Sequence, residues 1–97
     1  MSYDVDVADE SFNYTYNLAR FFIDFDVHPP TRLRGLTGAQ AADRIYDALR
    51  LITSWPVARL EEYNAPNGWG DWAGATVWLM QIRDAAKANP DAIVEVS

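Results

Sequence analysis

Catalysis by a reactive side chain depends here on one histidine, because the 97-residue chain has a single His and no Cys. His28 precedes two prolines, and acid–base or nucleophilic chemistry needs a hydroxyl or thiol held beside such an imidazole. No nucleophile-elbow pattern surrounds any serine, and no glycine-rich phosphate-binding motif is present. The serines are Ser2, Ser11, Ser54 and Ser97. We therefore expect no catalytic residue and no cofactor, and predict that the protein is not an enzyme.

Carboxylates near the amino terminus are the second candidate for chemistry. Asp4 and Asp6 alternate with apolar residues, which places both side chains on one face of a strand. Together with Asp9 and Glu10 they offer oxygen ligands for a divalent cation, but the spacing and the glycine of a calcium-binding loop are missing. Charged side chains on a strand also protect a sheet edge from aggregation. We predict no metal site and keep cation binding by Asp4 and Asp6 as an alternative.

The third candidate is the segment 64–74, NAPNGWGDWAG, which places two tryptophans among glycines. Pro66 and the pair Asn67-Gly68 have turn chemistry, so the chain is expected to reverse sharply before a helix that begins near Asp71. Trp69 and Trp72 then cover the core as a lid. The alternative is a ligand loop of Asn67, Trp69 and Trp72, with an aromatic-walled pocket at a helix amino terminus. No Arg or Lys lies in the segment, which favours the structural interpretation.

The charge distribution excludes several classes of partner. Net charge is −6, and acidic residues dominate both ends of the chain, so direct nucleic-acid binding is not expected. Only the middle third is basic, and we expect its Arg32 and Arg34 to pair with the acidic amino-terminal third, with contact to a binding partner as the alternative. No apolar run approaches the roughly 18 residues of a membrane span. The start of the chain lacks a secretory signal pattern, so we predict a cytoplasmic protein.

Periodicity predicts an α+β fold over residues 1–97 as one compact domain. Alternation at both ends of the chain predicts two strands that pair as a ribbon, and an isolated pair needs helices on one face. Apolar residues at spacings of three and four between them predict three to four α-helices. The predicted strands are 3–7 and 92–96, and the predicted helices are 14–25, 37–53, 57–63 and 71–89.

Capping residues set the expected helix ends. Asn13 is the expected N-cap of the first helix, and Thr37 with Gln40 forms a capping box for the second. Asp71 is the expected N-cap of the last helix, and Asn89 is expected to close it in the left-handed conformation before Pro90.

The helices carry more apolar surface than one stripe accounts for. The first helix has an inward stripe of Leu18, Phe21, Phe22 and Phe25. The last helix has an inward stripe of Trp72, Ala75, Leu79, Ile82 and Ala86. Outside these two stripes we expect an exposed patch of the kind that marks protein interfaces, made of Val77, Trp78, Met80, Tyr16 and Ile23. This surplus favours a non-enzymatic protein-interaction module, with a protein partner or self-association at the patch.

Short sequence motifs link the chain to a group of proteins. Residues 13–17 read NYTYN, residues 35–38 read GLTG, and residues 67–70 read NGWG with Gly74 following. Together these resemble small proteins encoded by actinobacteria and their phages, for which no activity is known. The resemblance implies a compact domain in a cytosolic context, in a bacterial host or a phage. With the interaction-module hypothesis, it leads us to expect a phage or prophage protein that acts on a host protein.

Overall fold

The two chain ends meet in one antiparallel sheet. The computed structural model describes residues 1–97. Its strands are β1 (Ser2–Val7), β2 (Glu10–Thr15) and β3 (Glu95–Val96), in the order β2-β1-β3. The amide of Asp4 donates to the Ser97 carbonyl at 3.0 Å, and the Ser97 amide donates back at 2.9 Å. The expected pairing of the chain ends is confirmed, but the sheet has three strands and not two.

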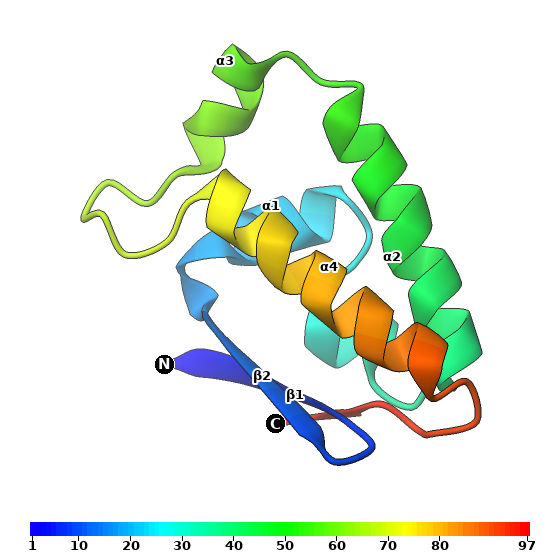
Figure 1. Ribbon diagram of the computed structural model, residues 1–97. Helices are drawn as coiled ribbons and strands as arrows, with labels where there is room; N and C mark the ends of the chain where they lie inside the picture. The colour runs from blue at the N-terminus through cyan, green and yellow to red at the C-terminus, as the bar shows by residue number, and fades with distance from the viewer.

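The helices cover one face of this sheet, so the predicted α+β class is confirmed. The α-helices are α1 (Ala19–Asp24), α2 (Gly38–Thr53), α3 (Val57–Leu60) and α4 (Trp72–Ala88). Three single turns connect them: the 3-10 turns η1 (Tyr16–Leu18) and η3 (Glu61–Tyr63), and the π turn η2 (Pro29–Leu33). Figure 1 shows α4 running between α2 and the β1–β2 hairpin, with both chain ends close together beside the sheet.

Strand β2 is the element that the sequence prediction missed. Residues Glu10–Thr15 pair with β1 along their whole length, and Ala8, at φ 52°, helps to form the tight turn between the two strands. The helix expected from Tyr14 therefore starts later, and the N-cap expected at Asn13 is wrong. Thr15 caps η1 instead, because its side chain accepts a hydrogen bond from the Asn17 amide at 3.2 Å. Pairing with β1 decides the conformation of a segment whose residues suit a strand equally well.

The inward stripes meet in a single core. All 24 buried apolar residues form one cluster, so the sheet and the helices stabilise each other. Tyr3, Val5 and Val7 of β1 are buried, as alternation predicts. The aromatic stripe of the first helix is also buried: Leu18, Phe21, Phe22 and Phe25.

Helices α2 and α4 run antiparallel and touch closely at Gly38. A Cβ added at Gly38 would lie 2.5 Å from the Ala86 carbonyl oxygen and still closer to that of Asn89. The capping box of Thr37 and Gln40 is confirmed, as is the N-cap at Asp71, whose carboxylate accepts from the Gly74 amide at 2.6 Å. Asn89 is not left-handed, with φ −130°, and its side-chain amide instead donates to the Ala85 carbonyl.

Candidate functional site

The segment 64–74, which we call the tryptophan loop, is held in place at the main chain of Trp69. The Trp69 amide donates to Asn67 Oδ1 at 3.0 Å, and the Trp69 carbonyl accepts from Asn17 Nδ2 at 3.0 Å. Gly68 and Gly70 have φ of 78° and 111°, which side chains rarely adopt. The loop conformation is therefore set by amide side chains from two distant parts of the chain.

The loop also packs against the end of β2. A Cβ added at Gly70 would lie 2.6 Å from Leu18 Cδ2 and 2.7 Å from Thr15 Cγ2. Tyr14 Oη contacts both main-chain polar atoms of Asp71, accepting from its amide at 3.2 Å and donating to its carbonyl at 3.0 Å. The NYTYN and NGWG segments thus form one structural unit, which no local pattern in the sequence predicts.

The lid expected from the two tryptophans is only half correct. Trp72 packs partly buried against the core, but Trp69 is 72% exposed. Trp78, which was not expected in the lid, is the buried tryptophan: it is 4% exposed, and its ring centroid lies 5.6 Å from that of Tyr14 and 5.5 Å from that of Phe22. Trp78 therefore does not belong to an exposed patch. The flank of α4 that carries it faces the hairpin whose second strand the sequence did not predict.

Beside Trp69 the surface is hollowed by about 490 Å³. We call this the asparagine hollow. Its lining residues come from the amino terminus and the start of β1, from β2, from η1 and from the tryptophan loop, and all except Met1 and Trp69 have neutral hydroxyl or amide side chains. The lining residues are Met1, Ser2, Asn13, Thr15, Asn17, Asn67 and Trp69. Of the expected ligand loop, Asn67 and Trp69 take part, whereas Trp72 does not.

The remaining residues of the expected interaction patch lie at the surface on separate elements. Val77 and Met80 of α4 are 52% and 42% exposed. Tyr16 is in η1 and Ile23 is in α1, and both are also exposed. The structure therefore divides the expected patch into an α4 part and an η1–α1 part, with the buried Trp78 belonging to neither.

A groove between α2 and α4 adjoins the α4 part of that patch. It measures about 470 Å³ and is lined by Ala39, Ala42, Asp43, Tyr46, Arg83, Lys87 and Pro90. Met80 precedes Arg83 and Lys87 by three and seven positions, so it lies on the same flank of α4, one turn further along. Tyr46 is exposed on the α2 wall, and sequence analysis missed it because it follows the inward residue Ile45 directly.

The carboxylates of the sheet do not converge. Asp4 accepts from Asn13 Nδ2 at 2.9 Å, and Asp6 accepts from Ser11 Oγ at 2.5 Å. Asp6 and Glu95 are register partners, but nowhere in the chain do three His, Cys, Asp or Glu side chains gather as metal ligands. The cation alternative therefore finds no geometric support at Asp4 and Asp6.

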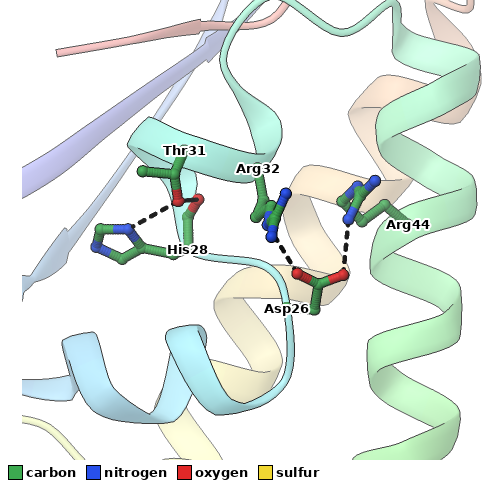
Figure 2. A network of polar contacts seen from close by, with 5 residues as sticks. All are labelled: Asp26, His28, Thr31, Arg32 and Arg44. Carbon is green, nitrogen blue, oxygen red and sulfur yellow. Dashed lines mark hydrogen bonds and ion pairs between the residues drawn. The ribbon is translucent and has the colours of Figure 1, made fainter.

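His28 joins two elements through hydrogen bonds. Its Nε2 lies 3.1 Å from Tyr3 Oη and its Nδ1 lies 3.1 Å from Thr31 Oγ1. Burial lowers the pKa of His28, and burial also raises the pKa of Tyr3, so both groups are neutral near pH 7. Figure 2 shows the ring directed toward Thr31 in the π turn. This arrangement ties β1 to η2.

Asp26 is the partner of Arg32, one of the two arginines that were expected to pair with the acidic amino-terminal third. Its carboxylate bridges Arg32 Nε and Arg44 Nη1, each at 2.8 Å, as Figure 2 shows. The pairing of Arg32 with the acidic amino-terminal third is thus confirmed. Arg34 makes a different contact, donating to the Val96 carbonyl at 3.0 and 3.2 Å.

Besides Trp69, a cluster of aromatic side chains lies at the junction of α1 and α3. The Arg59 guanidinium stacks 4.4 Å from the Trp55 ring centroid, and Tyr63 Oη donates to Asp24 Oδ2 at 2.6 Å. Burial and this hydrogen bond raise the pKa of Tyr63 to about 12. Because these groups satisfy one another, we assign them a structural role.

Comparison with known proteins adds no relative, since no family model, curated protein or solved structure matches the chain. None of the helices has the length and apolar character required to cross a membrane.

Proposed function

We propose that the protein is a non-enzymatic interaction module that binds a partner protein in the α2–α4 groove. The observation that carries the proposal is the exposure of Tyr46 and Met80 on the two helices that border this groove. Exposed apolar side chains around a concavity are typical of protein-binding surfaces. The hydrogen bonds that engage both ring nitrogens of His28 support a non-enzymatic role.

Helix geometry supports a shared rim for Tyr46 and Met80. The two helices run antiparallel from the contact of Gly38 with Ala86. Tyr46 lies roughly 12 Å along α2 from Gly38, and Met80 roughly 9 Å along α4 from Ala86, at about 1.5 Å per residue. The two side chains thus stand at a similar height across the groove, and Val77 extends the apolar surface along α4.

The charges of the groove favour a partner segment with an acidic group beside its apolar ones. Lys87 and Arg83 line the α4 wall, and Lys87 has no ion-pair partner in the chain, whereas Arg83 pairs only with its neighbour Asp84. Asp43 on the opposite wall disfavours a uniformly acidic segment. An amphipathic segment with one carboxylate at the α4 side meets both conditions. The resemblance noted above supports a host protein as the partner and a phage or prophage as the source.

The experiment is affinity capture with three single substitutions, after sedimentation has measured self-association of the purified protein. Met80→Glu and Tyr46→Glu should each abolish capture of the same partner, because a charge would be buried in the interface. Ile23→Glu is the matched control, since Ile23 is equally exposed on α1 and should leave capture intact. A partner retained by both groove variants would refute the proposal, and loss with Ile23→Glu alone would move the interface to the η1–α1 surface.

Small-ligand binding remains the second candidate because the asparagine hollow gives it a concave site beside the exposed Trp69.

A further inference from the structure

The asparagine hollow presents polar atoms that the protein itself leaves unpaired. Asn17 uses its Nδ2 on the Trp69 carbonyl, so its Oδ1 is free to accept. Asn67 uses its Oδ1 on the Trp69 amide, so its Nδ2 is free to donate. The two amides are fixed by the same loop yet offer opposite hydrogen-bonding groups to a ligand.

Residues of the two strands add further free hydrogen-bond donors and acceptors to the hollow. Asn13 Nδ2 donates within the sheet, to Ser2 Oγ at 2.8 Å and to Asp4 Oδ1 at 2.9 Å, which leaves Asn13 Oδ1 free to accept. Thr15 Oγ1 and Ser2 Oγ act as acceptors in the structure, so each retains a hydroxyl proton to donate. Ser2 and Thr15 are direct register partners, so these donors lie side by side.

Trp69 supplies one aromatic wall to this set of polar atoms. Its main chain is fixed at both the amide and the carbonyl, yet its indole stays exposed to solvent. Ordering the loop costs conformational entropy, and no burial of the indole offsets that cost within the chain. A ligand with an apolar face that packs on the Trp69 ring would offset part of this entropic cost.

Charge favours a neutral ligand. Neither Lys nor Arg lines the hollow, and the Asp4 carboxylate accepts a hydrogen bond from Asn13, one of the lining residues. The amino group of Met1 is the one cation among the lining residues, so the hollow lacks the cluster of cations that binds phosphate, sulfate or carboxylate groups. With mixed donors and acceptors, a single aromatic wall and no cationic side chain, the hollow suits a polyhydroxylated ring, whose hydroxyls donate or accept as required.

We propose that the asparagine hollow is a binding site for a neutral saccharide, with one face of the sugar ring on Trp69 and its hydroxyls on Asn13, Asn17 and Asn67. The site is separate from the α2–α4 groove and does not depend on it. A planar nucleobase fits less well, because the hollow has one aromatic wall and not a slot between two rings.

The test is a titration of the whole protein with neutral sugars, followed by NMR of the side-chain amides and the indole N–H groups. The probes are glucose, galactose, mannose, N-acetylglucosamine and their disaccharides, with adenosine and uridine as the competing class. At least one sugar should shift the Trp69 indole and the asparagine amide signals, with a dissociation constant of about 1 mM for so open a site. The tryptophan signals of the core, such as Trp78, should stay unchanged.

Three variants test whether residues of the hollow bind the sugar without affecting the stability of the fold. Trp69→Ala should weaken the binding at least about tenfold. Asn67→Asp keeps the acceptor for the Trp69 amide but removes the free donor and adds a charge, so it should abolish sugar binding without altering the melting temperature. Tyr46→Ala, in the α2–α4 groove, is the matched control and should bind sugar like the parent. The proposal is overturned if no sugar shifts these signals, if only the nucleosides do, or if Trp69→Ala binds sugar as the parent does.

Discussion

The Tyr14 hydroxyl is hydrogen-bonded to both main-chain polar atoms of Asp71, which joins strand β2 to the first residue before α4. Burial raises the pKa of Tyr14, so the phenol stays protonated and can donate and accept at once. This one oxygen links the NYTYN segment to the loop that carries Trp69. It therefore holds together the asparagine hollow and the amino terminus of α4.

Tyr14→Phe should lower the free energy of unfolding by about 1–2 kcal/mol, because the Asp71 amide loses its partner and the Asp71 carbonyl keeps only the Ala75 amide. Urea denaturation measures the loss, and hydrogen exchange at the Asp71 amide should accelerate. Tyr46→Phe removes an exposed hydroxyl that makes no hydrogen bond to the protein and is the matched control. Equal stability of the two variants would show that the Tyr14 contact is dispensable.

The tryptophans should differ widely in their contribution to stability, against the expectation of a two-tryptophan lid. Trp78→Ala should cost about 3–5 kcal/mol, because it opens a cavity among the rings of Tyr3, Tyr14 and Phe22. Trp69→Ala should stay within about 0.5 kcal/mol of the parent, since the side chain is exposed. Chemical denaturation of both variants tests the contrast, and a large loss with Trp69→Ala would mean that the loop packs inward in solution.

Trp78 also carries a buried donor, because its indole Nε1 has no hydrogen-bond partner. Trp78→Phe should therefore cost clearly less than Trp78→Ala, since it keeps most of the ring volume and removes an unsatisfied N–H. Comparison of the two variants by thermal unfolding measures the difference. Equal losses would point to a partner for the indole, such as a bound water molecule.

Gly38→Ala should destabilise the protein by about 1–3 kcal/mol or more, because the new methyl group would push α2 away from the carbonyls of Ala86 and Asn89. Gly35→Ala is an informative comparison. Gly35 has φ 84° and open space around it, so its substitution carries only the conformational cost of about 1–2 kcal/mol. If calorimetry shows that Gly38→Ala destabilises the protein less than Gly35→Ala does, the close contact between α2 and α4 is not rigid.

Protonation of His28 should weaken the fold. Burial lowers the pKa of His28 below its usual 6.5, so the unfolded chain binds this proton more tightly than the folded one. The stabilising contribution is complete above pH 6.5 and is lost as the pH falls through the lower pKa of the folded state. Because the chain has one histidine, its NMR signal reports the titration directly. A folded midpoint at or above 6.5 would contradict the burial effect.

Several features of this fold follow from local sequence alone. The capping box at Thr37, the N-cap at Asp71 and the buried stripe from Leu18 to Phe25 depend on residues within a few positions of one another. Hydrogen bonds and side-chain spacing along one helix do not need a distant partner, so their pattern is visible in the sequence. The alternation at both ends likewise predicted β1 and its pairing with β3.

The tertiary structure decided the rest, because each remaining choice depended on residues far apart in the chain. Residues 10–15 become a strand because β1 pairs with them, and this strand, with β1, determines which flank of α4 is buried. Trp78 therefore enters the core and Trp69 stays outside, although both are equally apolar. The candidate site has the same origin: Asn13, Asn17 and Asn67 are ordinary turn and strand residues until pairing and the Tyr14–Asp71 contact bring them to one hollow.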